Sequence, residues 1–253
     1  MNVIQIIEDL LFPRRCPVCL DVVSPPGTWV CDVCRDKLRP VIQPCCMRCG
    51  RQLDKRDAVQ EFCGNCREKR RSFEAGVVGW DYGSVPVRRM ISEVKYRNKR
   101  QLLDYPCRDM AERTKRRIRI WQAECLIPVP LHRSRRRKRG FNQAEEIADR
   151  LSAVWEIPVE KHLLFRKKKT APQKELGESG RLENLVSAFE ADAGCAKQYR
   201  SVILVDDILT TGATMEACAR ALKHAGIEHV YMAALSAGAG PQMSGTRRER
   251  HFR

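Results

Sequence analysis

The chain has 253 residues, 43% of them hydrophobic, and carries 47 basic against 31 acidic side chains, a net charge of +16. This composition suffices for a packed core and excludes a wholly disordered chain, and no apolar run approaches the roughly 20 residues that span a bilayer. The length exceeds that of a typical single domain, so we expect one large and one small domain. A net charge this high means that the protein should attract polyanions.

The first twelve residues, MNVIQIIEDLLF, are apolar but contain Glu8 and Asp9 and lack a basic start. They are typical of a short amphipathic helix and not of a secretory signal. We therefore expect a cytoplasmic protein whose cysteines stay reduced.

Nine of the 13 cysteines lie within the first 66 residues, and eight of these form four CxxC pairs, with Cys45 left over. One CxxC turn directs two thiolates at a metal about 2.3 Å away, and two turns complete a tetrahedron. The pattern predicts two structural zinc ions in a zinc-ribbon domain of residues 1–72. Sequential pairing is the simplest arrangement and an interleaved cross-brace is the alternative, while the missing signal peptide disfavours disulfides. The predicted ligands are Cys16, Cys19, Cys31, Cys34, Cys46, Cys49, Cys63 and Cys66.

Residues 73–240 are predicted to form the large domain, in which strands alternate with helices. The apolar run GVVGWDY at 76–82 is typical of a strand. Over 85–98 apolar residues recur at helical spacing with basic residues outside, and a second, very basic helix is expected over 100–120.

The middle of the large domain begins with a short apolar strand, CLIPVP, at 125–130. The sequence LHRSRRRKRGF at 131–141 is expected to form a charged loop, and a helix is expected from Asn142 to Leu151. Residues 166–180 are basic and then rich in turn residues, with no period.

The last part of the large domain has an order typical of a parallel sheet that is covered on both faces. The prediction here is a strand (201–205), a loop (206–213), a helix (214–225) and a strand (229–235). The basic residues 241–253 are expected to form a frayed tail.

The loop after the first of these strands carries the strongest chemical signal. Two aspartates end the strand, and the sequence TTGAT then opens a helix. Hydroxyls, backbone N–H groups and a helix N-terminus therefore meet at the carboxyl edge of the sheet and can hold a phosphate. Carboxylates beside a phosphate would repel it unless a ribose lay between them, so the pattern indicates a ribose 5-phosphate ligand.

This stretch resembles the phosphoribosylpyrophosphate (PRPP) signature of type I phosphoribosyltransferases. The whole chain resembles one branch of them, the competence protein F (ComF) family. Besides the cysteines, the segments WDYGSVPVRRMISEVKYRNKRQLL, IPVPLHRSRRRKRGFNQAEEIA and TAPQKELGESGRLENLVSAF carry this resemblance. It implies an α/β type I phosphoribosyltransferase fold, a parallel sheet with helices on both faces, behind the zinc ribbons.

The resemblance also implies roles for particular residues. Asp206 and Asp207 would be the catalytic pair, binding ribose hydroxyls and Mg²⁺. The 5-phosphate would be held by Thr210, Thr211, Gly212, Ala213 and Thr214. Pro130 and Leu131 occupy the place of the pyrophosphate loop, and Arg139 and Gly140 belong to a mobile-loop motif that closes over it. Arg181 and Asn184 lie in a further family stretch. We find no pattern that would recognise a nucleobase acceptor.

The positive charge is concentrated in residues 76–139, which have 18 basic and 6 acidic side chains and a net charge of +12. This exceeds what one pyrophosphate needs and suggests a surface for single-stranded nucleic acid. Four nearby aromatics could stack bases but fit the core better: Trp80, Tyr82, Tyr96 and Phe141. The candidate nucleic-acid residues are Arg133, Arg135, Arg136, Arg137 and Lys138.

Two functions fit these features. The first, implied by the family, is a PRPP-binding protein of DNA uptake and natural transformation that handles single-stranded DNA, with a helicase or transport proteins as partners. The second is an active phosphoribosyltransferase of nucleotide metabolism. The basic run and the lack of a pattern that would recognise a nucleobase favour the first function. The acceptor, the partners and the oligomeric state stay open.

Overall fold

A computed structural model of the chain describes residues 13–25, 27–53, 59–167 and 187–238. The expected N-terminal helix, the basic tail, and the stretch with Arg181 and Asn184 lie outside these residues. None of the described helices is long and apolar enough to cross a membrane.

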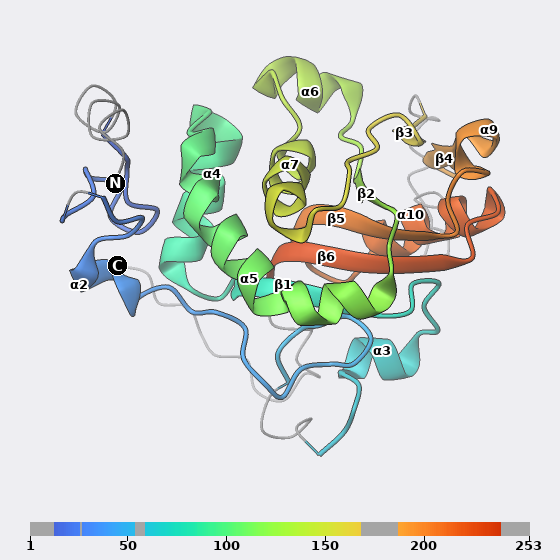
Figure 1. Ribbon diagram of the computed structural model, residues 1–253, viewed down its shortest axis with the longest axis horizontal. Helices are drawn as coiled ribbons and strands as arrows, with labels where there is room; N and C mark the ends of the chain where they lie inside the picture. The colour runs from blue at the N-terminus through green and yellow to red at the C-terminus, as the bar shows by residue number, and fades with distance from the viewer. Residues whose placement is uncertain (1–12, 26, 54–58, 168–186, 239–253) are drawn as a thin grey trace, which may run out of the picture.

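A four-stranded parallel sheet forms the centre of the fold (Figure 1). Its strand order is β1-β6-β5-β2, with the two longest strands in the middle. The apolar runs of these central strands are almost wholly buried, as expected for a sheet that is covered on both faces. The strands are β1 (Gly76–Asp81), β2 (Cys125–Pro128), β5 (Ser201–Leu209) and β6 (His229–Ala237).

Helices cover both faces of the sheet. In Figure 1 the helices α5 (Asp104–Trp121) and α7 (Gln143–Trp155) lie on one face, and α10 (Ala213–His224) lies on the other. Side chains alternate along β5, so that Ile203 and Val205 join one core while Val202 and Leu204 join the other. The first face also packs against α4 (Val85–Arg97) and the 3₁₀ helix η1 (Arg100–Leu103).

A small antiparallel hairpin flanks α10. It consists of β3 (Leu164–Arg166) and β4 (Phe189–Ala191) and is followed by the short helix α9 (Ala193–Ala196). Leu164 and Phe189 are buried in the same core as α10, so the hairpin extends that face.

The two halves of the cysteine-rich region pack into different cores. The first half, with α2 (Asp32–Arg35), shares the core of α4, α5 and α7. The second half, with α3 (Gly64–Glu68), shares the core of α10. Between them, residues 39–41 run beside β1, where Val41 N–H donates to the Gly79 carbonyl at 2.9 Å. The cysteine-rich region therefore packs on both sides of the sheet.

Glycine allows the second half to approach the sheet closely. Gly50 has a φ of +70°, and a Cβ there would lie only 2.5 Å from the carbonyl oxygen of Gly76 on β1. A side chain at this position would clash with backbone, so the knuckle packs directly on the strand.

The expected loop at 131–141 is wrong, because residues Arg133–Arg139 form a helix, α6. The nitrogen of the His132 side chain accepts from Ser134 N–H at the N-cap, and Gly140 ends the helix with a φ of +80°. Arginine and lysine are good helix formers, and cations near the C-terminus favour the helix dipole. Once these ends are closed, a run of cations is stable as a helix.

Two other boundaries differ from expectation. The loop expected at 206–213 begins later, because β5 continues to Leu209 by pairing with β6 as far as Ala237. The helix expected over 100–120 is divided into η1 and α5. Pro106 lies in the first turn of α5, where its missing N–H removes no helical hydrogen bond.

Candidate zinc centres and phosphate-binding site

The eight paired cysteines form two clusters, and within each cluster all four sulfurs lie within 4.8 Å of one another. The sulfurs of Cys19 and Cys31 are 3.9 Å apart, and those of Cys49 and Cys63 are 3.7 Å apart. A tetrahedron with zinc–sulfur bonds of about 2.3 Å has sulfurs about 3.8 Å apart. The clusters therefore fit two structural zinc ions, and the sequential pairing is confirmed over the cross-brace. Their members are Cys16, Cys19, Cys31 and Cys34, and Cys46, Cys49, Cys63 and Cys66.

The four thiols of the second cluster are close enough to change one another's pKa. Hydrogen bonding within the cluster lowers the pKa of the Cys46 thiol and raises the pKa of the Cys49 thiol. Every cysteine is free of disulfide bonds, which contradicts the disulfide alternative. Cys45 stays outside the cluster, and its thiol donates to the Ile42 carbonyl at 3.2 Å.

The two predicted acidic residues lie near the carboxyl end of β5. Strand β2 ends at Pro128, opposite Val205, so Asp206 and Asp207 lie just beyond the shorter strand. The Lys95 ammonium of α4 is 2.7 Å from the Asp207 carboxylate, and both side chains are less than one-fifth exposed. Burial, reinforced by the charge of Asp207, raises the pKa of Asp206 to about 7.

Helix α10 begins directly after the predicted phosphate loop and has no side-chain N-cap bond. By contrast, α6 and α7 are capped by the side chains of His132 and Asn142. The N-cap residue of α10 is Gly212, with a φ of +79°. Within the loop, the Thr211 hydroxyl accepts from Ala213 N–H at 3.3 Å. An open helix N-terminus of this kind offers N–H groups to an anion.

The predicted pyrophosphate loop lies beside the acidic pair. Val129 N–H donates to the Val205 carbonyl at 2.9 Å, so Pro130 and Leu131 follow at the same sheet edge as Asp206. Asn142 anchors the start of this loop, because its side-chain amide donates to the Val129 carbonyl at 3.1 Å. The structure thus brings the β2 loop and the end of β5 together.

The mobile-loop residues are adjacent to the same edge. The guanidinium of Arg139 is 5.4 Å from the ring centroid of Tyr96, the neighbour of Lys95, and donates to Gln143 Oε1 at 2.7 Å. Gly140 is the C-cap of α6. Both residues therefore lie at the junction of α4, α6 and α7.

Sequence reasoning missed three cations at this site. Lys95 was placed among the outward basic residues of its helix but faces Asp207. Arg51 and Arg71, from the second cysteine cluster, donate to backbone carbonyls of the phosphate loop. The one sequence signal for a site role of Lys95 is that it lies in a segment that carries the family resemblance. The two arginines have no local signal, because they reach the loop only through the fold.

The basic surface is divided into two parts. Helix α6 and the C-terminal half of α5 lie on opposite sides of α7 (Figure 1). On α5, Arg113 is 2.6 Å from Asp109, and Lys115 is 3.6 Å from Glu156. On α6 only Arg136 has an acidic partner among the described residues, a bidentate contact with Glu145 at 2.7 and 3.2 Å. Helix α6 therefore presents a dense, largely unneutralised positive charge, and Arg133, Arg135, Arg136, Arg137 and Lys138 are all exposed. The described part of α5 also has cations without an acidic partner, Arg116, Arg117 and Arg119 among them.

The aromatic residues near this charge belong mostly to the core. Trp80 and Phe141 are buried, and Tyr82 is partly buried against the first core. Tyr96 is 72% exposed, which contradicts the expectation of a core residue and leaves its ring accessible for stacking.

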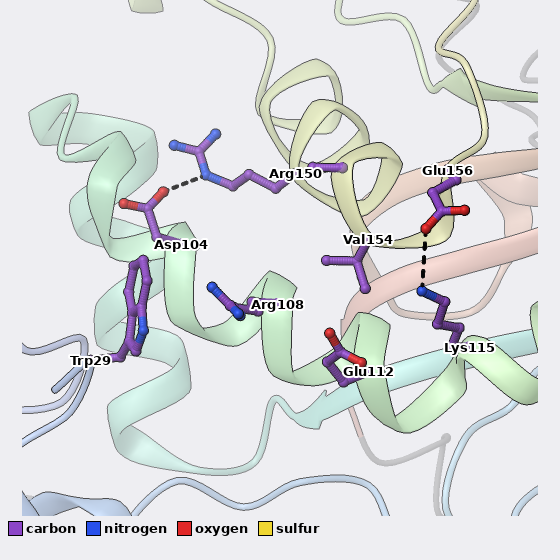
Figure 2. Close-up of a pocket in the computed structure, with 9 residues that line it drawn as sticks. Trp29, Asp104, Arg108, Glu112, Lys115, Arg150, Val154 and Glu156 are labelled. Carbon is purple, nitrogen blue, oxygen red and sulfur yellow. Dashed lines mark hydrogen bonds and ion pairs between the residues drawn. The ribbon is translucent and has the colours of Figure 1, made fainter. Parts of the chain in front are cut away.

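A cleft of about 410 Å³ lies between α5, α7 and Trp29 of the first cysteine region (Figure 2). Its charges are mixed, and two pairs close across it, Arg150 with Asp104 at 2.7 Å and Lys115 with Glu156. Because acidic groups balance its cations, this cleft is not suited to a polyanion, and it contains none of the predicted phosphate-site residues.

The fold and the two cysteine clusters define a phosphoribosyltransferase-type α/β protein with a double zinc ribbon. Residues 7–67 match the family model described as the double zinc ribbon domain, and residues 137–249 match that of the phosphoribosyl transferase domain.

Comparison with individual proteins identifies the branch. The chain is 30% identical over 227 residues to competence protein F of Haemophilus influenzae, which covers 87% of this chain and 95% of that protein. It is 27% identical over 207 residues to competence protein ComFC of Bacillus subtilis (79% and 80% covered). It is 26% identical over 200 residues to DNA utilization protein YhgH of Escherichia coli strain K12 (78% and 85% covered). The chain therefore belongs to the competence protein F family, as the sequence motifs predicted.

Proposed function

We propose that this protein binds PRPP with Mg²⁺ at the carboxyl edge of the sheet and handles single-stranded DNA on α6 during DNA uptake. The observation that carries the proposal is that Asp206 and Asp207, near the end of β5, are followed by the loop that opens α10, a helix whose N-cap residue Gly212 makes no side-chain bond. A 5-phosphate would accept N–H groups of the TTGAT loop, and ribose hydroxyls would donate to the carboxylates.

The residues at the edge suit a magnesium–pyrophosphate group. The carboxylate oxygens of Asp206 and Asp207 are ligands that Mg²⁺ accepts, directly or through water. Mg²⁺ would neutralise charge on the pyrophosphate, while Lys95 and Arg139 supply fixed positive charge beside it. Pro130 and Leu131 would place backbone groups along the pyrophosphate.

Two of the relatives are named competence proteins, and this name points to DNA uptake. Helix α6 offers the positive charge that a nucleic-acid ligand needs. Its cations are exposed and largely unneutralised within the described chain. Backbone phosphates would bind there without sequence preference, and Tyr96 offers an exposed ring next to Arg139.

The PRPP site is tested by thermal unfolding with and without PRPP and Mg²⁺. At 100 times its dissociation constant a ligand stabilises by about 2.7 kcal/mol, which for a chain of this size raises Tm by roughly 5 to 10 °C. Asp207→Asn should abolish this rise, because it removes a charge-assisted bond and a metal ligand. The control is Asp149→Asn, whose carboxylate pairs with Lys161 at 2.9 Å outside the site and should leave the rise intact. An Asp207→Asn protein that responds like wild type would contradict this ribose site.

The alternative, an active phosphoribosyltransferase, can be distinguished from a protein that only binds PRPP by the product it releases. Transfer to a base releases pyrophosphate, whereas PRPP binding alone does not. The protein is incubated with PRPP, Mg²⁺ and a panel of purine and pyrimidine bases, and pyrophosphate is measured. We expect binding without release, and base-dependent release would favour the enzyme.

A further inference from the structure

The second cysteine cluster lies directly behind the phosphate loop. One small cavity is shared by Cys49, Cys63 and Cys66 of the cluster and by Thr211 and Gly212 of the loop. Two arginines line the same cavity, Arg51 from within the second CxxC region and Arg71 from just after it.

Both arginines hold the loop by its carbonyl oxygens. Arg51 is 6% exposed, and its Nη2 donates to the Thr210 carbonyl and, at 3.5 Å, to the Leu209 carbonyl. Arg71 Nη2 donates to the Thr211 carbonyl at 2.9 Å. The Arg71 guanidinium also lies 3.6 Å from the position that a Cβ on Gly212 would take.

These contacts set the direction of the loop N–H groups. In a planar trans peptide the C=O of one residue and the N–H of the next point in opposite directions. Holding the Thr210 and Thr211 carbonyls toward the cluster therefore turns the N–H groups of Thr211 and Gly212 away from it. Those two N–H groups belong to the predicted phosphate-binding loop.

The first turn of α10 is also bound by the segment that follows the second cluster. Glu216 is 6% exposed, and its carboxylate accepts from Ser72 N–H and the Ser72 hydroxyl, both at 2.8 Å. The segment that follows the second cluster thus holds both the loop and the helix that it opens.

Several other nitrogens of the two arginines lack acceptors among the described residues. Arg51 Nε and Nη1, Arg71 Nε and Asn65 Nδ2 are buried without a hydrogen-bond partner. The cavity has a volume of about 10 Å³, at the lower limit for one water molecule, and one water accepts two hydrogen bonds at most. Buried N–H groups without acceptors are costly, so a negative charge close to the guanidinium groups would offset part of this cost.

No hydrogen bond joins these nitrogens to a cysteine sulfur in the structure, but the two guanidinium groups line the same cavity as three of the cysteines. Four thiolates around Zn²⁺ carry a net charge of −2, which the two guanidinium groups would balance, and groups around a metal site tune its ligands. We propose that Arg51 and Arg71 are positioning residues that link the second zinc centre to the phosphate loop, so that PRPP affinity depends on this centre. The proposal rests on the proposed function, since it concerns the same PRPP site.

The test measures PRPP affinity of the full-length, zinc-loaded protein by calorimetry in the presence of Mg²⁺. We expect Arg51→Gln and Arg71→Gln each to weaken the Kd about 10- to 100-fold while two zinc ions per chain are retained. The matched control is Arg48→Gln, in the same CxxC knuckle, whose guanidinium is 5.3 Å from the Phe62 ring centroid. Arg48 Nε is likewise buried without an acceptor, but Arg48 makes no hydrogen bond to the loop in the described structure. Its variant should therefore bind PRPP like wild type, which separates the loop contact from the loss of a cation near the cluster.

A second readout detects the electrostatic link between Arg51 and the thiolates. With cobalt in place of zinc, the thiolate-to-metal absorption band should move to longer wavelength in Arg51→Gln, because thiolates that lose a nearby positive charge donate electrons more readily. Unchanged PRPP affinity in both arginine variants, or weaker affinity without a band shift, would overturn the link. A wild-type protein that does not bind PRPP would instead overturn the proposed function, and an unshifted band would then also exclude the electrostatic link to the thiolates.

Discussion

At the residue scale, the unusual feature is a pair of adjacent carboxylates near the end of a buried strand. Asp207 is balanced by Lys95 at 2.7 Å, but Asp206 has no cation at a comparable distance among the described residues. Burial and the charge of Asp207 therefore keep Asp206 protonated up to a pH of about 7. Such an arrangement reduces folding stability and is typical of functional sites.

The raised pKa predicts a pH dependence of stability. The unfolded chain loses the Asp206 proton near its ordinary pKa of 3.8, whereas the folded chain keeps it up to about 7. The folded state thus binds more protons between these values, and stability falls as the pH rises through them. Asp206→Asn should match wild type near pH 4 and be more stable above pH 7, by up to about 4 kcal/mol at about 1.4 kcal/mol per pH unit.

This difference is measured by urea unfolding of the two proteins from pH 4 to 8. Asp192→Asn serves as a comparison, because Asp192 is an exposed N-cap residue of α9 outside the site. An Asp206→Asn protein whose advantage over wild type does not grow with pH would show that the carboxyl is ionised throughout.

At the element scale, α6 is a seven-residue helix with six cations and no acidic residue. It is stable because its ends are closed and because Glu145 of α7 neutralises Arg136. Isolated helices of this length do not form in water, so its position between β2 and α7 is essential. The result is a compact basic surface beside the predicted pyrophosphate loop.

This surface predicts a defined salt dependence for single-stranded DNA. If about four phosphates are neutralised, log affinity should fall with log salt at a slope near −3, at about −0.7 per phosphate. Replacing Arg135, Arg136 and Arg137 by alanine should weaken binding to all sequences alike. The slope should flatten by about 1.4, because Arg136 is already paired and only two free cations are lost.

The measurement is fluorescence anisotropy of a labelled oligonucleotide across a salt series. The control replaces Arg116, Arg117 and Arg119 of α5, on the other side of α7, and should change the slope less (Figure 1). No binding at low salt, or an α6 variant with unchanged affinity and slope, would exclude this surface as the DNA site.

At the scale of the whole molecule, the two cysteine clusters lie within the two cores that enclose the sheet. Cys16, Cys31 and Cys34 are buried with the residues of α4, α5 and α7, and the second cluster is buried with those of α10. Metal binding at such sites is part of the folding free energy. The zinc ions should therefore stabilise the sheet as well as the ribbons.

Elemental analysis of the reduced protein should find two zinc ions per chain. Zinc contributes about 10–16 kcal/mol in isolated zinc-finger peptides, so chelation should melt the cysteine-rich region and lower the Tm of the whole chain. Cys45→Ser is the matched control, because Cys45 is outside both clusters and its loss should leave the zinc content unchanged. Absence of zinc, or a chelated protein whose sheet melts at the original temperature, would contradict this.

The local features of this protein could be predicted from its sequence. CxxC spacing predicted both four-cysteine clusters, because a CxxC turn fixes the direction of its two thiolates within four residues. Unbroken apolar runs predicted the central strands, and helical spacing predicted the buried side of α4. Family motifs identified the branch, and the acidic residues and the TTGAT loop were recognised from their order along a single strand–helix connection.

The contacts between residues far apart in the chain could not be predicted, because they form only when the elements pack. The end of β5 moved to Leu209 because β6 supplies pairing partners, and the charged run at 133–139 became a helix because its neighbours closed both ends. Lys95 meets Asp207 across more than a hundred residues, and Arg51 meets the Thr210 carbonyl across 159. Such contacts leave no local pattern, because they depend on how elements pack and not on the order of the residues along the chain.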